Sequence, residues 1–181
     1  MVLVLCVFKH GYLQRRFGAA YLHVELLVAA GPRSMAFSVS PGGVFSGMEP
    51  DQLDLTDDHY EFLALPTSPQ EDDMILRTCE ACSQSHIPYN AWDTALSTLL
   101  PARWARDVDL FHAPSLHAAQ AVILILRECL DPASPVLETL QGVCSRSTNA
   151  IQLARRLRKA SSSVNQPSVW KMIGKAVVTP V

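Results

Sequence analysis

The segment spanning residues 116–130, LHAAQAVILILRECL, constrains the fold more than any other part of the sequence. On a helix, its apolar residues cover one face and much of the opposite side. The first face carries Ala118, Ala121, Val122, Ile125, Leu126 and Cys129, and the opposite side carries Ile123 and Leu124. A helix that is apolar nearly all round is typical of a buried position. The sequence therefore predicts a central helix that other elements must cover.

Runs of β-branched, aromatic and alternating residues in the first third of the chain predict strands. The expected strands span residues 2–8, 21–28, 35–40 and 59–65. Gly31-Pro32 marks a turn between the second and third of them, and Pro41-Gly42-Gly43 ends this hairpin.

The rest of the chain carries helix-start signals. Ser68-Pro69-Gln70-Glu71 combines an N-cap, a first-turn proline and a capping-box glutamate, and Ser134-Pro135 repeats the first two features. The expected helices span residues 68–83, 91–100, 116–130, 134–143 and 148–159. Strands followed by helices predict one α+β domain over residues 1–160. The three serines at 161–163 predict a loose C-terminal tail over residues 161–181.

Length and composition narrow the class of protein. The 181 residues suit a single domain, and no apolar run approaches the ~20 residues that a membrane helix needs. The N-terminal MVLVLCVF lacks the basic start and the cleavage site of a secretory signal. With five cysteines, an odd number, the sequence predicts reduced thiols and a cytoplasmic location.

Charge is distributed unevenly along the chain. Residues 1–138 carry a net charge of −9, whereas residues 139–181 carry +7 and no acidic side chain. The basic segment 155–159, RRLRK, either contacts an acidic partner or forms a solvated helix face. No zinc-finger, aromatic or glycine-rich pattern adds a nucleic-acid signal.

The start of the expected central helix is polar, with Ser115, His117 and Gln120. Free backbone N–H groups and the helix dipole stabilise negative charge at such a position. A reactive anion can therefore be held there, and simple capping by Ser115 is the alternative explanation.

Three pieces of the chain, in this order, resemble a known family. The first is His23 in YLHVELLV, followed by MAFSVS and two glycines; the second is Ile87-Pro88-Tyr89-Asn90 with Asp93; the third is LHAAQAVILILR. Over roughly residues 20–130, the chain resembles a circularly permuted member of the NlpC-type, papain-fold cysteine hydrolases. The resemblance implies a small antiparallel sheet packed on a buried central helix. It also implies a nucleophilic cysteine at the start of that helix and a strand histidine as its base.

The chain departs from this pattern at the nucleophile, because Ala118 stands where the resemblance places cysteine. Either an inactivating Cys→Ala substitution or a non-catalytic relative accounts for the alanine. His23 corresponds to the base, which would raise the thiolate fraction and protonate the leaving group. Backbone N–H groups at Ala118 and Ala119 would bind the oxyanion. Tyr89 and Gln120 are further donors, and His117 is a lining or capping residue.

A third residue would orient the histidine. If residues 29–34 form the hairpin loop, Val28 lies opposite Met35 and His23 lies opposite Ser40. Ser40 is therefore one candidate orienter, with Ser38 one step along on the same face. Glu25 is an equal candidate, because residues two apart on a strand share a face.

Three functions follow from the resemblance. The first is a thiol hydrolase, a peptidase or isopeptidase acting on a protein or peptide. The second is an acyltransferase or deacylase of the same fold, with a membrane contact near Trp170, Met172 and Ile173. The third is a non-catalytic protein that binds a peptide or protein partner beside His23 and Tyr89.

Other residue combinations carry weaker hypotheses. Cys79 and Cys82 could be half of a zinc or redox site, but a second pair is missing and helix packing explains them. Asp109, His112 and Ser115 lie too close in sequence for a hydrolase triad, and no G-x-S-x-G is present. The sequence predicts no metal and no cofactor.

Overall fold

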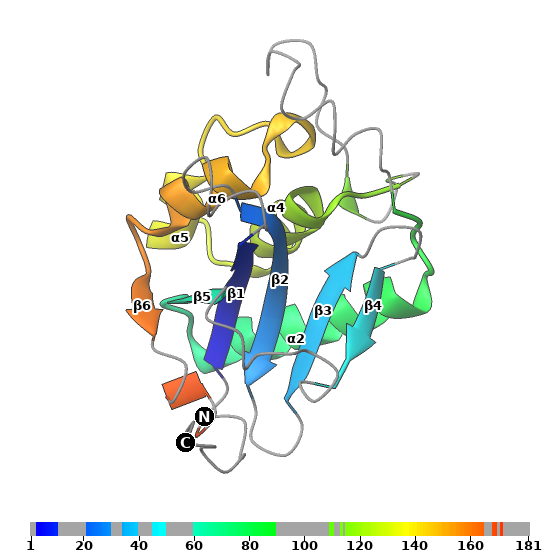
Figure 1. Ribbon diagram of the computed structural model, residues 1–181, viewed down its shortest axis with the longest axis horizontal. Helices are drawn as coiled ribbons and strands as arrows, with labels where there is room; N and C mark the ends of the chain where they lie inside the picture. The colour runs from blue at the N-terminus through cyan, green and yellow to red at the C-terminus, as the bar shows by residue number, and fades with distance from the viewer. Residues whose placement is uncertain are drawn as a thin grey trace.

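A six-stranded antiparallel sheet forms the framework of the molecule (Figure 1). The computed structural model describes residues 3–10, 21–29, 34–39, 45–49, 60–89, 109–110, 113, 115–164, 168–169 and 171. The strands are β1 (Leu3–His10), β2 (Tyr21–Ala29), β3 (Met35–Val39), β4 (Phe45–Met48), β5 (Tyr60–Ala64) and β6 (Ser162–Val164). Their order across the sheet is β4-β3-β2-β1-β5-β6, and each neighbouring pair is antiparallel.

Four of these strands were expected from the sequence, and their register agrees with it. Segments 2–8, 21–28, 35–40 and 59–65 correspond to β1, β2, β3 and β5. Val28 pairs with Met35, as the expected loop length requires. Ser40, the expected partner of His23, lies outside the described residues.

Among the described residues, four helices follow the first five strands, and two of them start with the signals expected from the sequence. They are α2 (Pro69–Gln84), α4 (Ala118–Cys129), α5 (Pro135–Thr139) and α6 (Ala150–Leu157), with a 3₁₀ turn at Ser145–Ser147. Ser68 and Glu71 form the predicted capping box of α2, and Ser134 caps α5. Helices α5 and α6 are shorter than expected. The expected helix over 91–100 lies outside the described residues.

The two faces of the sheet have different coverings. Alternate residues of a strand point to opposite faces. On β2, Val24, Leu26 and Val28 belong to the apolar core that includes residues of all four helices; we call this face the helix side. Leu27 and Ala29 point to the other face, which we call the outer side. There they pack with Val7, Ala36, Phe62 and Val169.

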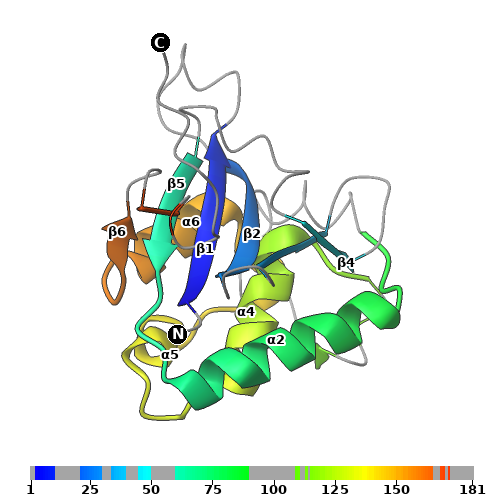
Figure 2. The same cartoon turned by 90° about the horizontal axis from the view of Figure 1, so that it is seen from below.

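Helix α4 is the buried central helix that its sequence predicts. Every residue from Ala118 to Leu126 is buried, and Ile123, Ile125 and Leu126 have no exposed surface. The helix lies against β2 and β3 and beside α2, and Figure 2 shows α2 and α4 against the same side of the sheet. Burial of a large aliphatic side chain contributes about 1.5–3 kcal/mol, so α4 supplies much of the energy that holds the two layers together.

Strand β4 was not expected, because it is short and contains a glycine. The edge of β4 that faces away from β3 is hydrogen-bonded to the end of α2 and to the residues that follow α2. The Gly47 N–H donates to Ser83 Oγ at 3.3 Å, and the Phe45 N–H donates to the Ile87 carbonyl at 2.8 Å. The two strand donors are therefore satisfied by a segment about 40 residues further along the chain.

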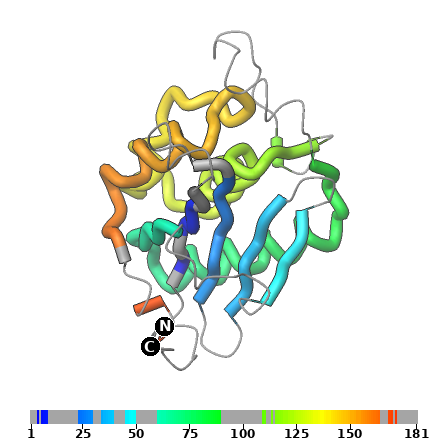
Figure 3. Tube along the Cα trace, in the orientation of Figure 1, coloured from blue at the N-terminus to red at the C-terminus, as the bar shows by residue number. Residues whose placement is uncertain are grey.

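The expectation of a loose tail from residue 161 is wrong for the residues that the structure describes. Ser162–Val164 is β6, which pairs with β5 at the sheet edge. Figure 3 shows this segment, in orange, continuing directly from α6. The side chain of Val169 is buried in the outer-side cluster. Arg158, just after α6, makes a bidentate ion pair with Glu61 of β5, with N···O distances of 2.8 and 2.6 Å. The sheet therefore continues past the domain boundary expected at residue 160.

These observations establish the α+β class, with one antiparallel sheet and four helices in the part of the chain that the structure describes. Within the described residues, no helix is both long enough and apolar enough to cross a lipid bilayer.

Gly47 provides a test of the packing between β3 and β4. A Cβ at this position would lie 2.8 Å from Phe37 Cε1, in a ring that stacks on Phe45 at 6.3 Å between centroids. We expect Gly47→Val to lower the free energy of unfolding by about 1–3 kcal/mol through overpacking, measured by urea denaturation. In a Phe37→Leu background the cost should shrink. An equal cost in both backgrounds would contradict the steric explanation.

Candidate functional site

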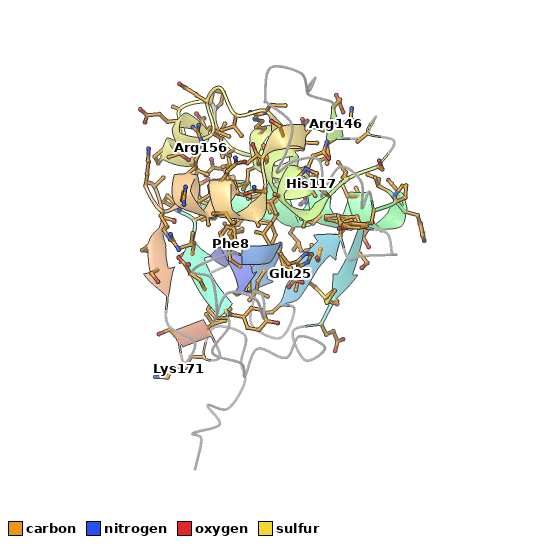
Figure 4. All side chains as sticks on the ribbon, turned by 45° about the horizontal axis from the view of Figure 1, so that its top comes forward. Phe8, Glu25, His117, Arg146, Arg156 and Lys171 are labelled. Atoms are coloured by element: carbon orange, nitrogen blue, oxygen red, sulfur yellow. The ribbon has the colours of Figure 1, made fainter. Side chains whose placement is uncertain are left out.

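The start of α4 is closed by the side chain of His117. Its Nδ1 accepts from the Gln120 N–H at 3.3 Å, and Gln120 Oε1 accepts from the His117 N–H at 3.4 Å. On the other side of the ring, Nε2 donates to the Arg146 carbonyl at 3.2 Å (Figure 4). These contacts match the imidazole tautomer with its proton on Nε2, and both ring nitrogens are engaged.

The histidine is therefore the cap of α4, and it is only 2% exposed. Of the two roles expected for His117, capping is confirmed. Ser115 is not the cap. Gln120 is 1% exposed and its side-chain oxygen completes the capping box, so its expected role as a substrate-facing donor has no support in this geometry.

The segment with Pro88 and Tyr89 lies beside the start of α4. Tyr89 forms an isolated parallel β-bridge with Leu116, and the Leu116 N–H donates to the Pro88 carbonyl at 3.0 Å. Pro88 is exposed and Tyr89 is half-buried. The structure thus brings Tyr89 next to the helix start, as the resemblance implies.

Ala118 and Ala119 occupy the first two positions of α4. The side chains end in methyl groups, and the residues are 9% and 2% exposed. In an α-helix the first N–H groups have no partner within the helix. Position 118 therefore combines the expected backbone setting of a nucleophile with a side chain that cannot react.

His23 lies in a separate polar cluster with Glu25 and Ser38. Its Nε2 is 2.6 Å from Ser38 Oγ and 3.2 Å from Glu25 Oε1. The His23 side chain is 20% exposed, whereas Glu25 and Ser38 are buried. Glu25 lies on the same face of the sheet as His23, as expected. Ser38 of β3 lies on that face too and contacts the His23 ring.

This cluster faces the outer side of the sheet. Val24 and Leu26 of β2 face the helix side. His23 and Glu25 alternate with them, so they point to the opposite face, as Leu27 of the outer-side cluster does. Figure 4 shows Glu25 on the sheet and His117 at the start of α4. No hydrogen bond or ion pair of the described residues joins His23 to Ala118.

The contacts of His23 also differ from those of an oriented catalytic base. In a nucleophile–histidine–carboxylate arrangement, the two partners bind opposite nitrogens of the ring. Here Ser38 and Glu25 both lie against Nε2. The second carboxylate oxygen, Glu25 Oε2, is buried without a hydrogen-bond partner. The cluster links β2 to β3, and its geometry is not that of a triad.

The predicted site residues therefore fall into two groups. Tyr89, His117, Ala118, Ala119 and Gln120 come together at the start of α4. His23 and Glu25 lie together on the outer side.

The Arg146 carbonyl, which contacts the ring of His117, could not be predicted from the sequence. A backbone contact between residues 29 positions apart leaves no signal in the sequence.

The buried cysteines are poor nucleophiles. Cys79 and Cys82 of α2 face the core near Cys129 of α4, whose Sγ lies 3.3 Å from Thr78 Oγ1. Burial raises the pKa of Cys82 to about 11 and that of Cys79 well above its usual range, with neighbouring thiols adding to both shifts. Burial also raises the pKa of Cys6 and Cys129. Packing, as expected, explains Cys79 and Cys82.

Among the described residues, no group of three or more His, Cys, Asp or Glu side chains is arranged to hold a metal ion. In the basic segment, Arg158 pairs with Glu61 and Arg156 donates to the Thr139 carbonyl at 3.2 Å. Arg155 and Lys159 are exposed.

Comparisons of the chain with models of protein families, with curated proteins and with solved structures find no match in any of the three.

The cap of α4 can be tested by two substitutions at one position. We expect His117→Ala to lower the free energy of unfolding by about 2 kcal/mol, because it removes a cap and leaves the Arg146 carbonyl without its donor. His117→Asn keeps a short acceptor for the Gln120 N–H and should cost about half as much. Urea denaturation measures both, and equal losses for the two variants would argue against a capping role.

Proposed function

We propose that this chain is a non-catalytic binding domain on a scaffold like that of the permuted NlpC-type hydrolases, and that it binds a peptide or protein partner beside the start of α4. The observation that carries the proposal is the direction of His23. Its imidazole faces the outer side of the sheet and contacts Ser38 and Glu25, whereas Ala118 lies on the helix side.

Among the residues that the structure describes, no activated nucleophile lies beside a free base at the start of α4, and this supports the binding proposal. Ala118 has no reactive atom, and both nitrogens of the nearby His117 imidazole are engaged, Nδ1 in the cap of α4 and Nε2 with the Arg146 carbonyl. The thiols of Cys79, Cys82 and Cys129 are buried and have raised pKa values. A thiol with a raised pKa is protonated near neutral pH and reacts slowly.

A partner could be recognised by the surface residues next to α4. Pro88 is exposed, and Tyr89 and Ser115 are half-buried. An aromatic ring with a polar hydroxyl and a nearby proline is typical of peptide-binding surfaces. The bridge between Tyr89 and Leu116 fixes this segment against the helix start, so a peptide would meet a preorganised surface.

A thiol hydrolase is the second candidate, for a form of the protein with cysteine at position 118. Two observations favour it: position 118 is the first residue of a buried helix, and the Pro88–Tyr89 segment lies beside it. For this candidate, a general base would have to reach the side chain of residue 118 from the helix side of the sheet. The acyltransferase alternative rests on Trp170, Met172 and Ile173, which lie outside the described residues.

Restoring a thiol at position 118 separates the two candidates. We expect the thiol of Ala118→Cys to react with iodoacetamide at about pH 6 no faster than an ordinary thiol, whose pKa is about 8.5. Ala133→Cys, on an exposed turn, supplies the ordinary thiol for comparison. Mass spectrometry maps the labelled residues.

His23→Ala in the Ala118→Cys background is the deciding control. Under the binding proposal it leaves the labelling rate at position 118 unchanged. Labelling at least tenfold faster than at position 133, and lost with His23→Ala, would establish an activated thiolate and favour the hydrolase.

The binding surface has its own test. Peptides selected from a displayed random library on the unmodified protein should lose affinity at least about tenfold on Tyr89→Ser, because aromatic anchors dominate peptide interfaces. Ser85→Ala, at an exposed position after α2, should leave affinity unchanged. If no peptide is enriched, or if binding does not depend on Tyr89, the surface beside α4 is not the binding site.

A further inference from the structure

The turn that follows α6 combines positive charge with hydroxyl groups. Arg155, Arg156 and Lys159 are exposed, and Figure 4 labels Arg156 on this part of the molecule. Ser161, two residues after Lys159, is half-buried. Ser162 and Ser163 of β6 are exposed. No acidic residue occurs anywhere in residues 139–181.

Ser161 has a sequence setting that no other hydroxyl residue of the chain shares. Arg158 stands three residues before it and Lys159 two residues before it, in the sequence RKAS. No other serine or threonine of the 181 residues has basic side chains at both of these positions. Protein kinases choose substrates by charge patterns of this kind, through acidic pockets that hold the basic side chains.

We propose that Ser161 is a phosphorylation site for a basophilic protein kinase, and that the phosphate releases β6 from β5. The phosphoryl donor is the Mg²⁺ complex of ATP. A bond forms between Ser161 Oγ and the γ-phosphorus, and the bond from that phosphorus to the β–γ bridging oxygen breaks, which leaves ADP. The hydroxyl proton passes to the catalytic carboxylate of the kinase.

The local structure makes Ser161 reachable at modest cost. Its Oγ donates to the Leu157 carbonyl at 2.6 Å, and its N–H donates to the same carbonyl at 2.9 Å. These bonds close the turn that follows the eight-residue helix α6, and turns at helix ends open with low free energy. Opening that turn, with Arg158 moving from Glu61 to the acidic pocket of the kinase, would free the hydroxyl and let residues 158–161 take the extended form that a kinase requires.

A phosphate at Ser161 would oppose the contacts that hold this part of the chain. It carries a charge of about −1.5 to −2 and would lie at the C-terminal end of α6, where the helix dipole disfavours negative charge. It would also compete with Glu61 for the Arg158 guanidinium, because phosphate is a strong bidentate partner for arginine. Since the Arg158–Glu61 pair ties the end of α6 to β5, β6 would lose its anchor.

The experiment incubates the full chain with Mg-ATP and, as the probe, the catalytic subunit of the cyclic-AMP-dependent protein kinase. Mass spectrometry should locate the phosphate on Ser161. Ser161→Ala should lower incorporation at least tenfold, whereas Ser163→Ala should leave it unchanged. Lys159→Gln removes an exposed charge and should lower the rate at least about threefold.

A second measurement tests the structural consequence. In the phosphorylated protein, amide hydrogen exchange in the pairs Leu63–Ser163 and Ala64–Ser162 should be at least tenfold faster than in the unmodified protein. The amides where β1 pairs with β2 serve as the internal control and should not change.

Three outcomes would overturn the proposal. They are absence of phosphate on Ser161, incorporation there that does not depend on Lys159, and phosphorylation of Ser161 with unchanged exchange in β5 and β6. The circular dichroism spectrum of each variant establishes that it is folded before its rate is compared.

Discussion

Burial of α4 against the helix side of the sheet is the interaction on which the rest of the structure depends. The helix contacts β2 and β3 on one side and α2 on another, so its apolar surface specifies where each layer lies. Such a helix must begin somewhere inside the protein, where free N–H groups would otherwise lack partners. His117 provides one such partner, because its Nδ1 accepts from the Gln120 N–H. Its Nε2 contacts the Arg146 carbonyl, so the residue that caps α4 also joins the helix start to the segment that follows α5.

Local signals made much of the fold predictable, and contacts distant in sequence account for the rest. Ser68 and Glu71 predicted the start of α2 because a capping box needs only four residues. Strand β4 was missed because its edge partners, Ser83 and Ile87, lie far along the chain. β6 was missed because its polar sequence carries no alternation, and only pairing with β5 makes it a strand.

The candidate site shows a second limit of sequence reasoning. The grouping of Tyr89 with Ala118 could be predicted from the order of motifs. The direction of His23 could not, because β2 has apolar residues on both faces: Val24 and Leu26 on one, Leu27 on the other. When both faces of a strand are buried, alternation alone does not say which face meets the helix. The position of α4 decides which face of β2 meets the helix. It thereby decides which groups the His23 side chain can contact.

The blocked edge of β4 has a consequence for encounters between copies of this chain. Two of its N–H groups already donate to Ser83 and Ile87, so an incoming strand would find no free donors at those two positions. At the other end of the sheet, β6 is a strand of three residues. Detaching it would uncover β5, a longer strand that contains Phe62 and Leu63. The two edges of the sheet therefore differ. While β6 is paired it covers the edge of β5, and self-association through strand pairing would begin at β5 once β6 is detached.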